Sequence, residues 1–400
     1  MNKTKITRHI RFQRAVYKVL VYTLGPVYGH IVKFKYEPYR PKSETFLFLS
    51  NHNMDLDAFL AVIVTKRHMR FVANEVILKG FAGKLISLLA GPIPRKKGAP
   101  TEELVDTIMH SLKSGISVGM YPEMERSWDG RTQAISFKTA KIAKESGAGL
   151  ITYVTNGGYL RAPHWSKSLR DGPLYGSVIH EYSPEELAKM SVQEIYEAIC
   201  EDLKADAFEF QRHHMYRYTG SDLAENIELA CFVCPACEST GQIVSKGDAL
   251  RCESCGYSAV YNEYGFLEGK GVIFENTALW SAWQKEWLKE NAEELKARTS
   301  EPIILNKDIS LLYTDNSGET KILAENARSA FYGDRIDVMP ENGSAISFML
   351  KDITKLGSYK RSKIMLTCSG KYFTIESASL PVSGYIYYAL WRVLTGRSYF

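Results

Sequence analysis

Short apolar runs alternate with segments of helical periodicity through the first half of the chain. Apolar or β-branched runs that end at turn residues predict buried strands, and we expect them at 45–49, 70–73, 116–121, 150–154 and 176–180. Between them, apolar residues spaced three and four apart predict helices at 57–66, 76–89, 101–113, 136–146 and 184–210. This alternation predicts an α/β fold with a largely parallel sheet and helices on both faces.

The pattern changes after residue 212. Two C-x2-C pairs enclose a short insert, and a charged helix with three tryptophans is expected over 277–298. From residue 303 onwards, strand-like runs alternate with turn sequences, and an aromatic helical segment at 383–394 closes the chain. We therefore divide the sequence into four parts: N-terminal helices, an α/β domain, the cysteine insert, and a helix followed by a small β domain. Their expected boundaries are 1–36, 37–215, 228–262 and 263–400.

Residues 1–36 contain basic side chains and no acidic ones. They also contain an approximately helical apolar stripe, formed by Ile10, Phe12, Val16, Tyr17, Leu20, Val21 and Tyr22. Lys18 and the Gly25-Pro26 pair interrupt the apolar run at 15–32, so we do not expect it to span a membrane. Basic and apolar side chains together favour one or two short helices lying on an anionic membrane face. A helix pair packed in the core is the alternative.

Length, charge and cysteine content narrow the class of protein. The chain has 400 residues, more than one domain usually needs, and a mild net charge of +5. Its seven cysteines are odd in number, which favours a reducing compartment over a framework of disulfides. The cysteine insert contains few Lys and Arg residues, which argues against a nucleic-acid partner.

His52 lies where a predicted strand ends and a helix begins. Ligands of open α/β sheets collect at the carboxyl ends of strands, so this is a favourable place for chemistry. If His52 lies in the turn and Asp57 in the first helical turn, the carboxylate can reach the imidazole. A histidine oriented in this way is a suitable general base. The H-x4-D spacing also arises by chance, so this pair needs support from other motifs.

Two further motifs place an arginine in a turn after a predicted strand or helix. Glu123 and Arg126 come directly after the strand expected at 116–121, and Arg95 lies in a basic turn at 91–98. The planar guanidinium of arginine suits a phosphate group. An arginine in a turn is also often simply solvated, so each motif is weak by itself.

Taken in order, these motifs resemble the glycerolipid acyltransferase family, of PlsC-like or 1-acylglycerol-3-phosphate O-acyltransferase-like proteins. His52-x4-Asp57 is similar to motif I of that family, 74–95 to motif II and 121–127 to motif III. The resemblance extends from about residue 40 to 200. Motif III is usually written F-P-E-G-T-R-S; here Tyr121 replaces Phe, and Met124-Glu125 replaces Gly-Thr.

The resemblance implies a mechanism. His52, held by Asp57, would remove a proton from a hydroxyl of a lysophospholipid, and the alkoxide would attack an acyl thioester on coenzyme A or acyl carrier protein. Arg95 and Arg126 would hold the acceptor phosphate, while Glu123 would fix Arg126 or a hydroxyl, or form a structural ion pair with Arg126. The resemblance also implies an enzyme of phospholipid synthesis. The basic and apolar side chains of residues 1–36 add the expectation of peripheral, monotopic association with the cytoplasmic face of the cell membrane. The alternative is a non-catalytic lipid-binding or scaffold protein.

The cysteine pairs resemble a zinc ribbon. Cys234, Cys237, Cys252 and Cys255 form two C-x2-C pairs separated by fourteen residues. Four thiolates leave Zn²⁺ no open position, so the predicted role is structural. Cys231 and Cys234 form an alternative pair, although the Cys-Pro-x-Cys sequence fits a zinc-binding turn better. The last hundred residues are loosely similar to pleckstrin-homology-like modules.

Overall fold

The computed structural model describes residues 3–54, 57–95, 101–123, 126–315, 318–359, 361–377 and 381–397. The chain forms two compact units, one comprising 1–161 and 171–216 and the other 162–170 and 217–400. The segment 162–170 leaves the first unit and packs within the second, where Trp165 and Arg170 contact Tyr261.

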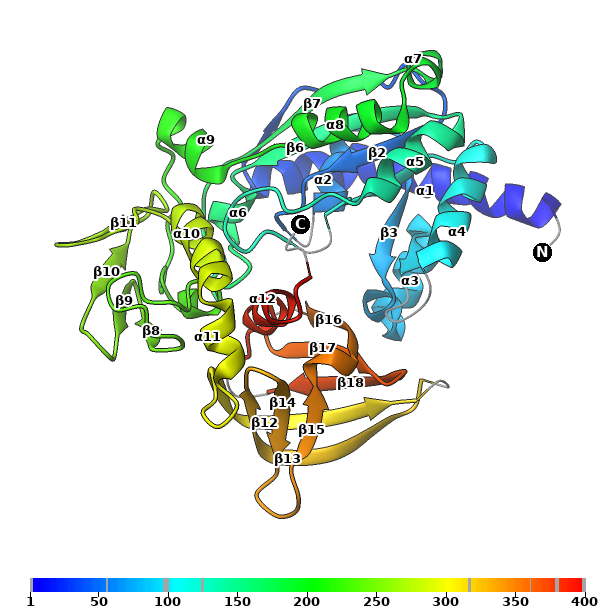
Figure 1. Cartoon of the computed structure of the whole chain (residues 1–400). Coiled ribbons are helices and arrows are strands. Elements are labelled where there is room, and N and C mark those ends of the chain that lie inside the picture. Colours follow the sequence, from blue (N-terminus) through cyan, green and yellow to red (C-terminus); the bar gives the residue numbers. More distant parts are fainter. Residues whose placement is uncertain are drawn as a thin grey trace. The chain divides into compact units, whose positions relative to one another are not determined.

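A seven-stranded, mixed sheet forms the centre of the first unit (Figure 1). Its strands are β1 (Phe34–Tyr36), β2 (Phe46–Ser50), β3 (Arg70–Asn74), β4 (Ile93–Arg95), β5 (Val118–Met120), β6 (Gly149–Asn156) and β7 (Leu174–Tyr182), in the order β1-β7-β6-β2-β5-β3-β4. Every pair is parallel except β6 and β7. The five predicted strands are confirmed, and the sheet is mostly parallel as expected. The antiparallel pairing of β7 with β6 was not predicted, and neither were the strands β1 and β4.

Helices cover both faces of this sheet. The helices are α1 (Lys3–Ile31), α2 (Asp57–Thr65), α3 (Gly80–Ala90), α4 (Thr101–Lys113), α5 (Phe137–Ser146), α6 (Gly158–Arg161), α7 (Pro184–Lys189), α8 (Val192–Asp202) and α9 (Ala207–His214), with a 3-10 turn at Glu75–Leu78. Apolar residues of α4, α5, α7 and α8 share one core with β2, β5 and β6. Nearly every side chain of α2 is buried, and α1 packs on it through Tyr17, Val21 and Val62.

The single helix predicted over 184–210 is wrong, because three helices occupy that stretch. Ser183 and Ser191 each begin a helix with a capping box, in which the serine hydroxyl and a glutamate three residues later satisfy backbone N–H groups. Asp206 begins the third by accepting from the N–H groups of Phe208 and Glu209. Caps inside a helical pattern start new helices, even where the apolar period continues.

The N-terminal segment forms one 29-residue helix, α1, that continues through Pro26. One face of α1 is buried at Gln13, Tyr17 and Val21, while Phe12 and Tyr22 of the predicted stripe are exposed. The helix therefore packs against the protein with one face and presents apolar side chains to solvent with another. No helix among the described residues is both long and apolar enough to cross a membrane.

The second unit begins with a small antiparallel sheet around the cysteine insert. Its strands are β8 (Ile243–Lys246), β9 (Ala249–Cys252), β10 (Ser258–Tyr261) and β11 (Leu267–Glu268), after a 3-10 turn at Ile227–Leu229. The helix predicted over 277–298 is interrupted at Asn291, giving α10 (Thr277–Glu290) and α11 (Ala292–Ala297).

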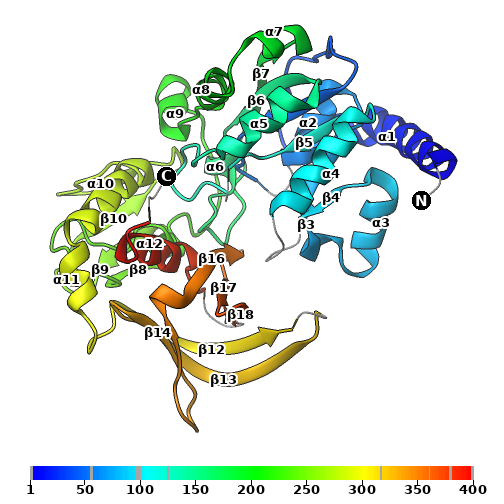
Figure 2. The same cartoon turned by 45° about the vertical axis from the view of Figure 1, so that its right-hand side comes forward.

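A second seven-stranded sheet, fully antiparallel, fills the C-terminal part of this unit. Its strands are β12 (Ile304–Thr314), β13 (Thr320–Phe331), β14 (Arg335–Met339), β15 (Ile346–Met349), β16 (Ile353–Tyr359), β17 (Lys363–Cys368) and β18 (Lys371–Glu376), with a 3-10 turn at Leu350–Asp352. β12 pairs with both β13 and β18, so it joins a four-stranded and a three-stranded meander. α12 (Gly384–Leu394) packs on β16 and β17, as Figure 2 shows. Buried Tyr387 bonds to Asn306 and Ser329, so the aromatic helix closes the core.

Candidate active site

The predicted site residues follow or end three parallel strands, β2, β5 and β4, whose carboxyl ends share one edge of the sheet. His52 follows β2 by two residues, and Glu123 follows β5 by three. Arg95 is the last residue of β4. β5 lies beside β2, whereas β4 is three strands away, or about 14 Å at the usual strand spacing. The fold therefore brings Glu123 beside His52 and leaves Arg95 on the same edge at a distance.

His52 and Asp57 form a hydrogen-bonded pair. His52 Nδ1 lies 3.1 Å from Asp57 Oδ2. A carboxylate can only accept, so Nδ1 carries the proton and Nε2 is left as the basic nitrogen. The imidazole side chain is 27% exposed, whereas the carboxylate is 1% exposed. A substrate can therefore reach the imidazole, while the carboxylate that orients it is sealed from water.

The same carboxylate oxygen also organises the turn that carries His52. Asp57 Oδ2 accepts hydrogen bonds from the N–H groups of Asn53, at 2.7 Å, and Met54, at 2.8 Å. An anion at the start of α2 is also favoured by the helix dipole. This arrangement holds the imidazole in a defined position, but it occupies two backbone donors that an oxyanion would otherwise have used.

Glu123 ties the loop after β5 to the turn of His52. Its carboxylate accepts from the backbone N–H of His52 and from that of Gln133, both at 2.6 Å. The N–H of Ser127 in turn donates to the carbonyl of His52, at 3.2 Å. Burial raises the pKa of Glu123 to about 8, against the lowering effect of the two backbone bonds. The two oxygens of the Glu123 side chain thus each hold one backbone N–H of the site, one from His52 and one from Gln133.

The two arginines predicted to bind phosphate lie differently. Arg126 is half-buried and directly precedes Ser127, whose N–H donates to the His52 carbonyl, so its backbone lies in the loop that is fastened to the His52 turn. Arg95 is exposed at the end of β4. Of the two, Arg126 belongs to the loop beside the His52 turn, whereas Arg95 lies three strands away along the sheet.

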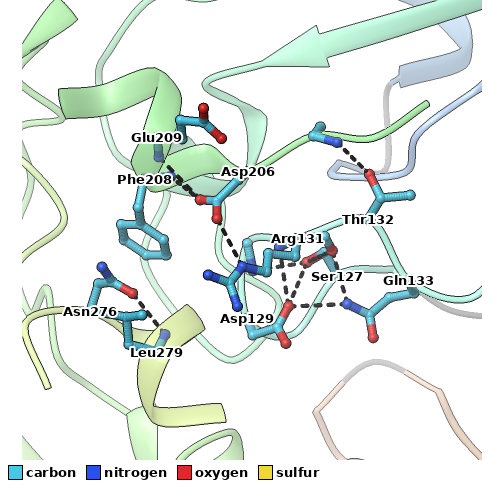
Figure 3. A network of polar contacts seen from close by, with 12 residues as sticks. Ser127, Asp129, Arg131, Thr132, Gln133, Asp206, Phe208, Glu209, Asn276 and Leu279 are labelled. Atoms are coloured by element: carbon cyan, nitrogen blue, oxygen red, sulfur yellow. Dashed lines mark hydrogen bonds and ion pairs between the residues drawn. The ribbon is translucent and has the colours of Figure 1, made fainter. Parts of the chain in front are cut away.

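A polar network holds the rest of the loop in place, as Figure 3 shows. The side chain of Asp129 accepts from the Arg131 N–H and from the amide of Gln133, both at 3.1 Å. Arg131 bonds through Nε to Asp206, at 2.8 Å, and Asp206 also caps α9. The loop that carries Glu123 and Arg126 is thus fastened to a helix that begins more than seventy residues later, a link that the sequence did not indicate.

Several site residues were not singled out by their sequence. Asn51 exchanges two hydrogen bonds with the backbone of Thr155, which fixes the end of β2 to the end of β6. Gln133 bonds to Glu123 through its backbone N–H alone. Any residue type except proline could do the same, so the sequence could not indicate this contact. Tyr121 stacks on the imidazole of His52, with ring centroids 4.2 Å apart and an interplanar angle of 16°. In the sequence, Tyr121 stood out only because it replaces the usual Phe of motif III.

The four predicted cysteine ligands meet in the second unit. The sulfur atoms of Cys234, Cys237, Cys252 and Cys255 all lie within 4.8 Å of one another and could hold a metal ion. Sγ of Cys234 lies 3.7 Å from that of Cys255, and Sγ of Cys237 lies 3.8 Å from that of Cys252. A tetrahedron of thiolates around Zn²⁺ has edges of about 3.8 Å, so the spacing fits. Cys231 lies outside this cluster.

Two similar turns present these sulfurs. The residue after the second cysteine of each pair, Glu238 or Gly256, has a positive φ, of 60° and 78°. The first turn is fastened to α10 through buried Gln284, whose amide accepts from the N–H groups of Phe232 and Val233. The indole of Trp280 donates to the carbonyl of Val233, at 2.9 Å. The first cysteine turn and α10 are therefore one packed structure.

Comparison with known proteins gives one family match and one similar solved structure. The acyltransferase family model matches residues 31–155. That stretch contains His52, Asp57, Arg95, Glu123 and Arg126. Among solved structures, the chain is similar to the 1-acyl-sn-glycerophosphate (LPA) acyltransferase PlsC from Thermotoga maritima, at 17% identity and a TM-score of 0.39, over 54% of this chain and 81% of that chain. No curated protein matches the chain.

Proposed function

We propose that this protein is a membrane-associated O-acyltransferase that transfers a fatty acyl group from a thioester to the hydroxyl of a lysophospholipid. The observation that carries the proposal is the His52–Asp57 pair, a partly exposed imidazole oriented by a buried carboxylate within the stretch that matches the acyltransferase family. A single general base suffices for this reaction, because the acceptor hydroxyl is itself the nucleophile.

The residues support a direct transfer. Nε2 of His52 takes the proton of the acceptor hydroxyl while Asp57 stabilises the imidazolium that forms. The acceptor oxygen attacks the thioester carbon, and the tetrahedral intermediate then collapses to an ester. The thiolate leaves and takes the proton back from His52. Arg126, in the loop fastened to the His52 turn, would hold the phosphate of the acceptor through charge-assisted hydrogen bonds. Arg95 would contact a more distant part of the same ligand.

We further propose that an apolar patch on α1 and α3 lies on the cytoplasmic face of the cell membrane. Gln13 of α1 donates to the carbonyl of Leu88 in α3, which joins the two helices. Their exposed apolar side chains are Phe12, Val19, Tyr22, Phe81, Leu85, Ile86 and Leu88. Phe81 is 86% exposed, which is unusual for so large an apolar side chain. Exposed Arg11, Lys18 and Lys84 on the same helices suit an anionic lipid surface.

The second unit supports a structural role. We propose that the cysteine cluster holds one Zn²⁺ as a zinc ribbon, and that the C-terminal sheet and α12 form a pleckstrin-homology-like module. The four thiolates would fill the coordination sphere of the metal, so the cluster would stabilise the fold and perform no catalysis. The meander of four strands, the meander of three strands and the closing helix support the second assignment.

An activity assay tests the proposed reaction. Purified protein on anionic vesicles that contain 1-acylglycerol-3-phosphate receives an acyl thioester of coenzyme A or of acyl carrier protein. We expect equal amounts of free thiol and new ester, and we expect His52→Ala to reduce the rate at least 100-fold without changing Tm greatly. Binding of both lipids without thiol release would favour a lipid-binding or scaffold protein. Near wild-type turnover by His52→Ala would show that His52 is not the base.

Vesicle flotation tests the membrane contact. We expect Phe81→Asp together with Leu85→Asp to release the protein from anionic vesicles, because both side chains would enter the lipid. Ile322→Asp is the control, since Ile322 is an apolar residue of the second unit whose exposure, 58%, lies between those of Phe81 and Leu85. Deleting 1–36 should also weaken flotation, and high salt should weaken it only in part. Equal flotation of the Phe81/Leu85 variant and the wild type would place the contact elsewhere.

A further inference from the structure

Tyr121 lies directly against the proposed general base. Its ring is nearly parallel to the His52 imidazole, at a centroid distance of 4.2 Å, and Phe71 stacks on it at 6.0 Å. The rings therefore form a stack at the carboxyl edge of the sheet. This packing restricts the plane of the imidazole and places the Tyr121 ring directly beside the proposed base.

The hydroxyl of Tyr121 is buried and has no hydrogen-bond partner among the described residues. Buried polar atoms are almost always paired, and an unpaired one costs about as much as a lost hydrogen bond. Burial, and to a lesser degree the carboxylate of Asp57, raise the pKa of Tyr121 well above its usual value. The phenol therefore stays protonated and can donate.

The reaction needs a donor at this place. Transfer from a thioester develops negative charge on the carbonyl oxygen, and preorganised donors stabilise that charge. The N–H groups of Asn53 and Met54 already donate to Asp57, and the N–H of His52 donates to Glu123. Three backbone donors of the turn are thus occupied by acidic side chains, whereas the Tyr121 hydroxyl has no partner among the described residues.

We propose that the Tyr121 hydroxyl donates a hydrogen bond to the carbonyl oxygen of the bound acyl thioester and stabilises the oxyanion formed during transfer. This role rests on the proposed function. As the acceptor oxygen bonds to the carbonyl carbon, the electron pair of the C=O double bond moves to the oxygen that Tyr121 contacts. When the C=O bond re-forms, the carbon–sulfur bond breaks, and the thiolate takes its proton from the His52 imidazolium. Tyr121 keeps its own proton throughout.

Removing only the hydroxyl tests this role. We expect Tyr121→Phe to lower kcat at least tenfold, with little change in KM for the acceptor, because the hydrogen bond strengthens in the transition state. We also expect its Tm to stay equal or rise by a few degrees, since the variant removes an unpaired buried polar atom. A merely structural hydroxyl would lower activity and Tm together.

Tyr153→Phe is the matched control. The Tyr153 hydroxyl is also buried without a partner among the described residues, but it points at Gly176 in β7, where an added Cβ would lie 1.6 Å away. We expect this variant to keep wild-type turnover. Wild-type turnover of Tyr121→Phe, or a loss matched by a lower Tm, would overturn the role of Tyr121 and leave the proposed function intact. A wild-type protein that transfers no acyl group from either donor would overturn both.

Discussion

Replacing Asp57 by Asn separates the orientation of the base from the stability of the fold. Asp57 Oδ2 accepts hydrogen bonds from His52, Asn53 and Met54. Asn can keep all three acceptor contacts with its carbonyl oxygen, but without the charge. A hydrogen bond to a charged group is worth about 1 kcal/mol more than a neutral one, so the two backbone bonds lose about 2 kcal/mol together. Relief from burying a carboxylate offsets part of this.

The expected loss of rate is much larger than this loss of stability explains. A domain with an unfolding free energy of about 5–15 kcal/mol stays almost entirely folded after losing about 2 kcal/mol. The imidazolium that forms during transfer, however, loses its carboxylate partner, and general-base catalysis contributes about 10²–10⁴ to the rate. We therefore expect Asp57→Asn to lower kcat about 100-fold or more, measured as thiol release, while thermal unfolding shows a modest fall in Tm.

Asp202→Asn provides the control. Asp202 Oδ2 accepts from the hydroxyls of Thr152 and Tyr182, both at 2.8 Å, away from His52. This variant should lose a similar amount of stability and keep its turnover. The reasoning would be refuted if Asp57→Asn retained turnover within threefold of the wild type, or if both variants lost rate in proportion to Tm.

Three further predictions concern the acceptor, pH and metal. Arg126→Ala should raise KM for a phosphate-bearing acceptor about 10- to 150-fold, corresponding to about 1.5–3 kcal/mol for a charged hydrogen bond, and unchanged KM would mean that Arg126 does not bind the acceptor. Burial holds the pKa of Glu123 at about 8, above its ordinary 4.5, so the folded state binds the extra proton. Its contribution to stability is therefore full below about pH 4.5 and is lost as the pH rises through about 8; denaturant titrations should show this fall in the wild type but not in Glu123→Gln. Elemental analysis of protein purified without added metal should find about one zinc per chain, and chelation should change Trp280 fluorescence while leaving turnover intact; a metal-free protein with four titratable thiols would exclude the ribbon.

Several features could be predicted from the sequence because they depend on local physics. Apolar runs bounded by turns identified the five strands that lead into and flank the site, since burying such runs is favourable in any arrangement of the sheet. The H-x4-D spacing placed Asp57 in the first turn of α2, where a carboxylate reaches back to His52. The C-x2-C spacing alone brought the two sulfurs of each pair together, and the turn sequences after residue 303 located most of the C-terminal hairpins.

Other features depend on contacts between residues far apart in the chain, and only the tertiary structure decided them. Strand order placed Glu123 beside His52 and Arg95 about three strand spacings away, although both lie at the carboxyl ends of parallel strands. Glu123 bonds to backbone N–H groups, which every residue type except proline carries, so no sequence pattern could name its partners. The same apolar stripe of α1 divides into a buried and an exposed face only because α2 covers one side of it. Likewise, Tyr121 acquires an unpaired hydroxyl beside His52 only through the burial that the surrounding fold imposes.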